Sequence, residues 1–144
     1  MFKRILVPTD GSDITSKAVN IAIDLALAGE SQMFVVSVKE PFPYSAISEM
    51  QPVPPQEFYD AQERIAAGRV KSVADTAKAA GVACSGHTVE ALHPWEAILD
   101  HAKAQQCDLI VMASHGRRGV AALLLGSETQ RVLIHSSLPV LIVK

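Results

Sequence analysis

Apolar positions along the chain fall into two alternating patterns, short continuous runs and stripes at helical spacing. Runs typical of strands lie at 2–7, 33–38, 82–89, 108–113 and 138–143. Stripes typical of helices lie between them, over 14–28, 57–80, 93–102 and 127–135. Strands and helices that alternate in this way form right-handed βαβ units. The pattern predicts an α/β fold, a single doubly wound five-stranded parallel sheet of order 3-2-1-4-5 with helices on both faces.

The spacing also predicts which side of each helix is buried. In the first helix the predicted stripe consists of Ile14, Ala18, Ile21, Leu25 and Ala28, with Gly29 just past the helix end. In the second helix it consists of Ala66, Val70, Val73 and Ala77, and Gly81 ends the helix. The run at 82–89 is more polar than the others and is expected at an edge of the sheet. The stretch 41–55 holds five of the eight prolines and is expected to be an irregular loop.

Composition narrows the class of protein. A chain of 144 residues fits one domain, 1–144, and its 49 % hydrophobic content excludes a disordered chain. The net charge of −2 argues against nucleic-acid binding, and the 5 % aromatic content argues against base stacking. Neither a signal segment nor a membrane-spanning run of about 20 apolar residues is evident, so we expect a cytoplasmic protein that binds no membrane. Cys84 and Cys107 are expected to be buried thiols.

Two polar, glycine-containing loops mark the expected ligand site. One is 8–12, after the first strand, and the other is 114–119, after the fourth strand, which leads on to a helix beginning near Ser127. If these strands are neighbours, both loops meet at the crevice where the strand order reverses, the usual ligand position in such sheets. Backbone N–H groups and a helix N-terminus at that place favour a phosphate. A plainer interpretation stays open, in which the glycines serve only as turn formers.

Four short motifs occur in order along the chain: KRILVPTDGS at 3–12, SHGR at 114–117, LLGS at 124–127 and SLPVLIV at 137–143. Together they resemble the universal stress protein family. The resemblance implies a domain that dimerises, and the family's ATP-binding branch carries the motif Gly-x2-Gly-x9-Gly-Ser/Thr. Gly116 and Gly126 match its second and third glycines, and Ser127 follows. Ala113 stands at the first glycine position, a departure that favours a member without nucleotide binding, whereas the other matches favour a nucleotide-binding member.

The resemblance also implies where a nucleotide lies. The adenine is placed against Val38, and the ribose and phosphates are placed among Pro8, Thr9, Asp10, Met112, Ala113, His115, Gly116, Gly126, Ser127 and Thr129. The implied nucleotide is ATP, with ADP or AMP as alternatives. Asp10 either holds a divalent metal such as Mg²⁺ through the phosphates or caps its own turn. Ser127 offers an N–H and a hydroxyl to the phosphates at a helix start. It is also a candidate N-cap of that helix, and the two roles are compatible.

Other polar residues carry weaker signals. Ser114 and His115 suggest a nucleophile and a base, but adjacent residues at a strand end are expected to point to opposite faces. Arg117 and Arg118 are expected to be solvated or, alternatively, to reach a terminal phosphate. The remaining histidines lack metal-ligand spacing and are expected on the surface or in loops; they are His87, His93, His101 and His135.

The leading hypothesis is a cytoplasmic universal stress protein that binds adenine nucleotide and acts as a dimeric regulatory module for an unknown client protein. The apolar strand at 138–143, predicted at a sheet edge, is the expected homodimer interface. Two rivals stay open. One is a family member that has lost nucleotide binding and acts through protein contacts, and the other is a slow ATPase. No catalytic residue is assigned.

Any ATP hydrolysis is expected to be slow, well below the ~10 s⁻¹ of a median enzyme. The chain carries no Gly-Lys-Ser/Thr of the Walker type and no assigned general base, so phosphoryl transfer lacks a catalytic group. A steady-state assay of phosphate release checks this expectation. Hydrolysis at the median rate would show that a catalytic site has been mistaken for a binding site.

Overall fold

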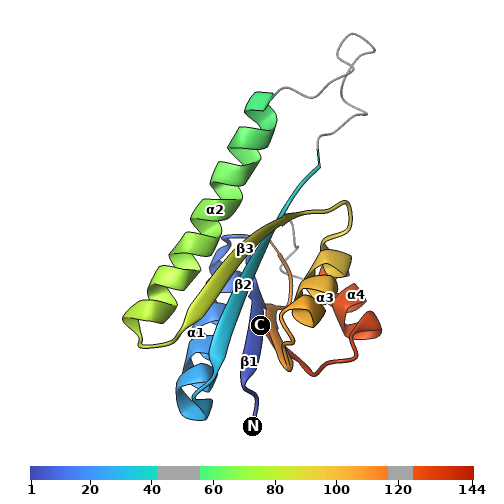
Figure 1. Ribbon diagram of the computed structural model, residues 1–144. Helices are drawn as coiled ribbons and strands as arrows, with labels where there is room; N and C mark the ends of the chain where they lie inside the picture. The colour runs from blue at the N-terminus through green and yellow to red at the C-terminus, as the bar shows by residue number, and fades with distance from the viewer. Residues whose placement is uncertain (42–55, 117–124) are drawn as a thin grey trace.

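The computed structural model describes residues 1–41, 56–116 and 125–144. The chain runs β1 (Arg4–Pro8), α1 (Asp13–Gly29), β2 (Gln32–Lys39), α2 (Gln56–Ala79), β3 (Cys84–Glu90), α3 (Pro94–Ala104), β4 (Leu109–Ala113), α4 (Ser127–His135) and β5 (Val140–Val143) (Figure 1). The strands pair in parallel in one five-stranded sheet of order β3-β2-β1-β4-β5, which confirms the predicted fold class. β3 and β5 are its edges. No helix within the described ranges has the length and apolarity that a membrane crossing requires.

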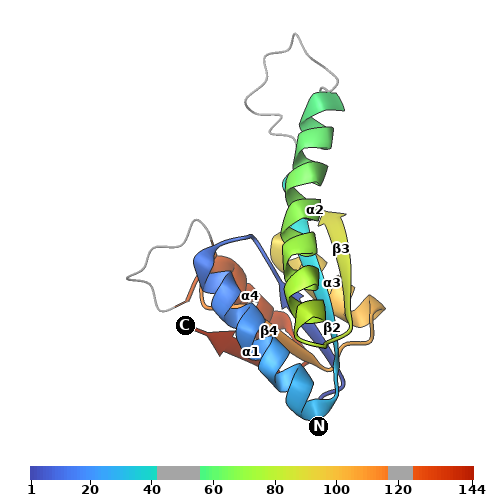
Figure 2. The same ribbon diagram turned by 90° about the vertical axis from the view of Figure 1, so that its left-hand side faces the viewer.

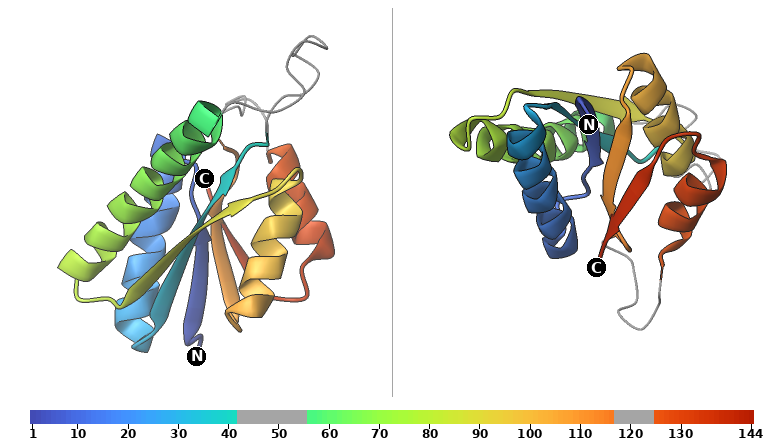
Figure 3. Two further views of the ribbon diagram at one scale, coloured as in Figure 1. Left: turned by 45° about the horizontal axis from the view of Figure 1, so that its top comes forward. Right: turned by 90° about the horizontal axis from the view of Figure 1, so that it is seen from below.

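Helices cover both faces of the sheet. Figure 2 looks onto the face covered by α1 and α2, and Figure 3 shows α3 and α4 on the opposite face. Successive residues of β1 point into the two cores in turn. Ile5 and Val7 pack with the residues of α1 and α2, whereas Leu6 packs with those of α3 and α4. Because both faces are buried, the central strands read as continuous apolar runs in the sequence.

The predicted buried face is confirmed for α2 and is correct only in part for α1, where Ala18 is buried and Leu25 is partly buried against the core. In α2 the buried residues are Ala66, Val70, Val73 and Ala77. In α1 they are Thr15, Ala18, Val19, Ala22, Ile23, Ala26 and Gly29. Ile21, a member of the predicted stripe, is 37 % exposed. The row Ala18, Ala22 and Ala26 faces the core, so from Ala18 onward the buried side continues through Ala22 and not through Ile21.

The end of α1 also differs from the prediction. Gly29 is the last helical residue, and the left-handed cap is Glu30 at φ 51°. A Cβ on Gly29 would lie 2.9 Å from the Ser31 hydroxyl oxygen, so close packing calls for glycine at this position. Gly81, at φ +89°, follows the end of α2 as predicted.

One histidine contradicts the expectation of a surface position. His101 of α3 is 8 % exposed, and its ring centre lies 4.8 Å from that of His87 on β3. Burial, and after it the charge of the His87 ring, lowers the pKa of His101 below its usual value of 6.5. The packing of α3 against the sheet, which helical spacing alone does not reveal, places this side chain inside.

The lowered pKa of His101 predicts that the protein loses stability as the pH falls. The folded chain binds the His101 proton less readily than the unfolded chain, so the unfolded chain is protonated first. The contribution of neutral His101 to the free energy of unfolding is therefore complete above about pH 6.5 and is lost as the pH falls through the folded-state pKa. Urea denaturation at about pH 7.5 and about pH 5.5 measures the loss. His101→Gln should reduce the difference, and an unchanged difference would assign the effect to other groups.

Candidate functional site

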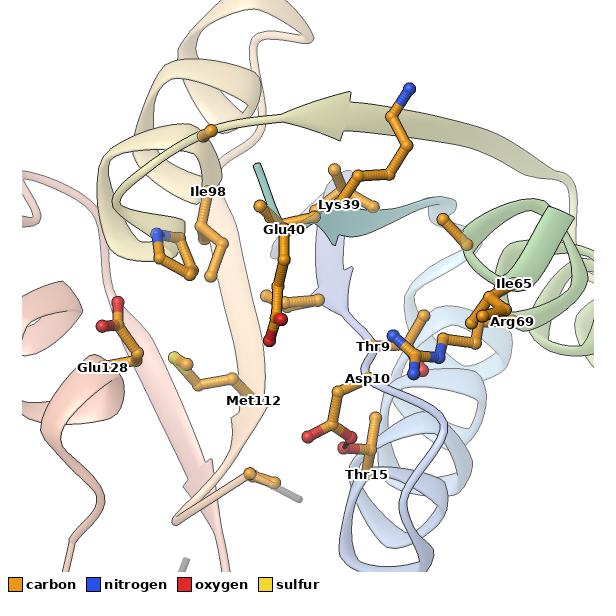
Figure 4. Close-up of a pocket in the computed structure, with 18 of the residues that line it drawn as sticks. Thr9, Asp10, Thr15, Lys39, Glu40, Ile65, Arg69, Ile98, Met112 and Glu128 are labelled. Carbon is orange, nitrogen blue, oxygen red and sulfur yellow. Dashed lines mark hydrogen bonds between the residues drawn. The ribbon is translucent and has the colours of Figure 1, made fainter. Parts of the chain in front are cut away.

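A pocket opens at the carboxyl ends of β1, β2 and β4, where the strand order reverses (Figure 4). Its cavity volume is about 280 Å³. Nine of the eleven residues predicted to bind nucleotide line it: Pro8, Thr9, Asp10, Val38, Met112, Ala113, His115, Gly116 and Thr129. They come from separate segments of the sequence, so the fold brings the two predicted loops together at one place.

The loop after β1 is held by its own hydrogen bonds. The N–H of Thr9 donates to the Val36 carbonyl of β2 at 2.9 Å, which extends the sheet pairing beyond the strand end. Oδ1 of Asp10 accepts hydrogen bonds from the Ser12 N–H and from the Thr15 hydroxyl, each at 2.9 Å. Asp10 therefore caps its own turn, one of the two roles that the sequence left open, and ties that turn to the start of α1.

The loop after β4 lies directly against Asp10. A Cβ built on Gly116 would lie 2.8 Å from Oδ2 of Asp10, closer than a real side chain tolerates. Gly11 and Gly81 are the described glycines with positive φ, and Gly116 is not among them. Glycine at 116 therefore lets the backbone lie close to the Asp10 carboxylate, which a side chain would have to displace, and no left-handed turn is involved.

The N-terminus of α4 is fastened to the same loop. The N–H of Gly126 donates to the Ser114 carbonyl at 2.7 Å, and a Cβ on Gly126 would lie 3.1 Å from Cα of His115. Gly126, at φ −70°, is the N-cap of α4, so Ser127 is the first helical residue and its predicted N-cap role is wrong. Gly126 and Ser127 are outside the pocket wall, but they set the start of α4, whose next two residues belong to that wall.

Ala113, at the first glycine position of the motif, is the last residue of β4 and is 7 % exposed. Its φ is not positive, so the backbone there accepts a side chain without strain. Its carbonyl accepts a hydrogen bond of 3.0 Å from the hydroxyl of Thr129, which is 3 % exposed. This bond joins the end of β4 to the first turn of α4 at the pocket wall.

The sequence placed Val38 and Thr129 at this site but missed four charged residues of the pocket wall, which come from the end of β2, from α2 and from the first turn of α4. The charged residues found there are Lys39, Glu40, Arg69 and Glu128. Figure 4 shows the Glu40 side chain reaching into the cavity and the Arg69 guanidinium turned toward Thr9 and Asp10. The sequence could have indicated Arg69, because this residue directly precedes Val70 of the predicted buried stripe. It could also have indicated Lys39 and Glu40, because they directly follow the predicted second strand, at the edge of the sheet where ligands bind.

Lys39 is held at the pocket by an ion pair. Its Nζ lies 2.8 Å from Oε2 of Glu63 on α2, and the Thr88 hydroxyl of β3 lies 3.1 Å from each carboxylate oxygen of Glu63. The hydrogen bond from Lys39, and after it the one from Thr88, lowers the pKa of Glu63. The three side chains link β2, α2 and β3 beside the pocket.

Ser114 and His115 do not point apart as predicted. Both residues follow the end of β4, where strand alternation no longer holds, and Oγ of Ser114 lies 3.2 Å from Nδ1 of His115. Ser114 is 3 % exposed and is not part of the pocket wall. A buried hydroxyl outside the wall is not placed to attack a ligand in the pocket, so the contact carries no catalytic assignment.

The whole chain, residues 1–144, matches the model of the universal stress protein family. The chain belongs to this family. The resemblance seen in the sequence motifs is thereby confirmed. A curated relative, the universal stress protein in the QAH/OAS sulfhydrylase 3′ region of Thermus aquaticus, is 34 % identical, and the match covers 100 % of both chains.

Solved structures of the universal stress protein family share the fold. Protein MJ0577 of Methanocaldococcus jannaschii superposes with a TM-score of 0.85 at 26 % identity, over 100 % of this chain and 96 % of its own. A universal stress protein solved in complex with cAMP gives a TM-score of 0.73 at 26 % identity, over 99 % of this chain and 97 % of its own.

Some of the predictions from the sequence concern residues of this universal stress protein that the structure does not describe. Arg117, Arg118 and Leu124 lie outside the described residues, as does most of the proline-containing stretch 41–55. Within the described ranges, no group of three or more His, Cys, Asp or Glu side chains is arranged to hold a metal ion.

Proposed function

We propose that this universal stress protein binds an adenine nucleotide, ATP or alternatively ADP or AMP, in the pocket at the ends of β1, β2 and β4. Residues 1–144 form one domain in this proposal. The protein acts in the cytoplasm as a dimer, and it regulates a client protein during the stress response. One observation carries the proposal. The Gly116 backbone meets the Asp10 carboxylate at the point where the strand order reverses, in a cavity that also includes the first turn of α4.

The cavity has an apolar part that suits a base and a polar part that suits ribose and phosphates. Val38, Ile98 and Met112 supply aliphatic surface, against which a planar base gains by leaving water. The polar part is formed by the Gly116 backbone and the first turn of α4. The first N–H groups of a helix have no partner within it, and together with the helix dipole they favour phosphate oxygens.

Asp10 fits a role toward a divalent cation that accompanies the nucleotide. Its Oδ1 is engaged within the turn, and its Oδ2 lies on the side of Gly116, where the polar part of the cavity begins. A carboxylate is a hard oxygen ligand of the kind that Mg²⁺ prefers, and Mg²⁺ commonly combines one or two carboxylates with substrate phosphates. Asp10 would hold Mg²⁺ together with the phosphates, and the cation would neutralise part of their charge beside this carboxylate.

The ligand class is supported by a relative. The universal stress protein solved with cAMP is 26 % identical over nearly the whole of both chains. The compound cAMP shares its adenine and ribose with ATP, so the comparison favours recognition of the nucleoside part. The loop at Gly116 and the first turn of α4 would then recognise the charge and the number of the phosphates.

Two measurements on the purified, tag-free chain test the proposal. Mass spectrometry of small molecules released by denaturation should detect an adenine nucleotide, and calorimetric titration of the stripped protein should show saturable binding of ATP with Mg²⁺. The absence of a released nucleotide together with the absence of binding heat for ATP, ADP and AMP would overturn nucleotide binding. The rival that acts through protein contacts, which Ala113 favours, would then be the better account.

Ala113→Gly is expected to change ATP affinity by less than tenfold, about 1.4 kcal/mol. The position ends a strand without positive φ, so glycine relieves no backbone strain there. The Thr129 bond to the carbonyl of residue 113 does not depend on the side chain. Calorimetric titration of the variant beside the wild type measures the difference. If the wild type gives no heat and Ala113→Gly binds tightly, the alanine marks a loss of nucleotide binding.

A further inference from the structure

A row of side chains on one face of β2 ends in a carboxylate at the mouth of the pocket. Phe34 and Val36 are buried in the core beneath α3 and α4, and Val38 packs against that core. Because side chains alternate along a strand, Glu40 is the next residue of this row. Pro41 follows and favours an extended backbone at Glu40, so the alternation continues to this residue. The row therefore changes from apolar to acidic where it meets the cavity.

The end of β2 extends beyond the end of β1. The pairing of β1 with β2 reaches Val36, whereas the pairing of β2 with β3 reaches Lys39. Past Val36, β2 is part of the cavity wall. Figure 4 shows the Glu40 side chain reaching from this extension into the cavity, between Met112 and Asp10 in that view. A nucleotide that occupies the cavity would therefore meet the Glu40 carboxylate.

Among the described residues, the cavity wall has two other carboxylates, those of Asp10 and Glu128, and each has a structural contact. Oδ1 of Asp10 accepts hydrogen bonds within its own turn, and its Oδ2 lies on the side of Gly116. Oε2 of Glu128 accepts a hydrogen bond of 2.9 Å from the Trp95 N–H at the start of α3. Glu40 differs from both because its side chain reaches into the cavity, where the middle of a bound nucleotide would lie.

The chemistry of a carboxylate restricts which part of a nucleotide it can bind. An ionised carboxylate accepts hydrogen bonds and donates none. The 2′ and 3′ hydroxyls of ribose are two adjacent donors, and they match the two carboxylate oxygens. The edge of adenine matches less well, because a ring nitrogen that accepts hydrogen bonds lies beside the amino group. Phosphates are repelled by the like charge, which favours their placement at the N-terminus of α4.

We propose that Glu40 binds the ribose hydroxyls and thereby selects ribonucleotides over 2′-deoxyribonucleotides. This selectivity rests on the proposed function, the binding of an adenine nucleotide in the same pocket. In dinucleotide-binding βαβ units, an acidic residue after the glycine-containing turn and its helix hydrogen-bonds the ribose 2′-hydroxyl. Glu40 has the comparable place, after the loop 8–12, α1 and β2. A site that hydrogen-bonds a hydroxyl rejects an analogue that lacks it, and hydrogen bonds to a charged group are among the stronger ones.

Calorimetric titrations of the stripped protein with ATP and with 2′-deoxy-ATP, both with Mg²⁺, test the selectivity. The wild type should bind ATP about tenfold or more tightly than 2′-deoxy-ATP. In Glu40→Ala the two affinities should lie within about twofold of each other, and the core stays intact because Glu40 is exposed. The ratio is insensitive to a change of charge that affects both nucleotides equally. The matched control is Glu90→Ala, since Glu90 pairs with Lys39 at the same end of the sheet but is not part of the pocket wall. It should keep the wild-type ratio.

A third nucleotide, ITP, separates recognition of the ribose from recognition of the base. ITP has the ribose of ATP and an oxygen in place of the adenine amino group, so Glu40→Ala should leave the ratio of ATP to ITP affinity within about twofold of the wild type. A changed ATP to ITP ratio with an unchanged ATP to 2′-deoxy-ATP ratio would assign Glu40 to the base and overturn the proposal. Equal affinity of the wild type for ATP and 2′-deoxy-ATP would overturn it while nucleotide binding stands. The absence of heat for every nucleotide would overturn the proposed function, and the selectivity with it.

Discussion

Gly126→Val is expected to abolish ATP binding while the chain stays folded. A Cβ on Gly126 would lie 3.1 Å from Cα and 3.2 Å from Cβ of His115, and the two further carbons of valine would add to this conflict. The loop of residues 114–116 must then move, and with it the Gly116 backbone that lies against Asp10. The affinity should fall by about a hundredfold or more, which corresponds to about 2.8 kcal/mol. Because φ of Gly126 is −70°, valine adds no backbone strain that would unfold α4.

The matched control for this variant is Gly68→Ala. Gly68 lies within α2, and a Cβ at this position would meet no atom within 4 Å. Alanine there should leave ATP affinity unchanged and raise the free energy of unfolding by about 1 kcal/mol, through higher helix propensity. Calorimetric titration measures binding, and circular dichroism confirms folding of both variants. A folded Gly126→Val protein that binds ATP like the wild type would show that the nucleotide does not occupy this pocket.

The fold could be predicted from the sequence because its signals are local and repeated. Strand runs and helix stripes alternate, and the right-handed crossover rule leaves few sheet orders, of which the observed order is one. The buried face of α1 could not be predicted in the same way. Two rows of apolar residues overlap in that helix and share Ala18; the row that continues through Ala22 and Ala26 is buried, whereas Ile21 is 37 % exposed. Helical spacing alone does not distinguish two such overlapping rows.

The candidate site was predictable where it depends on loops that directly follow strands. Thr9, Asp10 and Gly116 meet because parallel strands place their carboxyl ends at one edge of the sheet. Arg69 was not predicted, because a charged residue on a helix usually lies in solvent, and its place at the pocket depends on where α2 crosses the strand ends. The burial of His101 likewise depends on how α3 packs against β3.

Leu141→Glu is expected to convert a dimer into a monomer. β5 is an edge strand that pairs with β4 alone among the described strands, and Leu141 on it is 39 % exposed. Unpaired backbone groups and an exposed apolar side chain on an edge favour pairing with a second copy about a two-fold axis. A carboxylate at this position would have to lose its water in the interface without an opposite charge. Val143, on the same strand, does not serve this test, because it is 6 % exposed within the core and a charge there would unfold the chain instead.

Light scattering coupled to size-exclusion chromatography measures the mass of each variant in solution. The wild type should have twice the mass of one chain, and Leu141→Glu should have the mass of one chain with unchanged circular dichroism. Leu27→Glu is the matched control, since Leu27 on α1 is 50 % exposed and is not part of the edge strand. It carries the same change of charge, so it should remain a dimer if the edge strand is the interface. A wild type that is a monodisperse monomer at micromolar concentration would contradict the proposed dimer. A monomeric Leu27→Glu variant would place the interface elsewhere, because the edge of β5 would then be insufficient to hold two copies together.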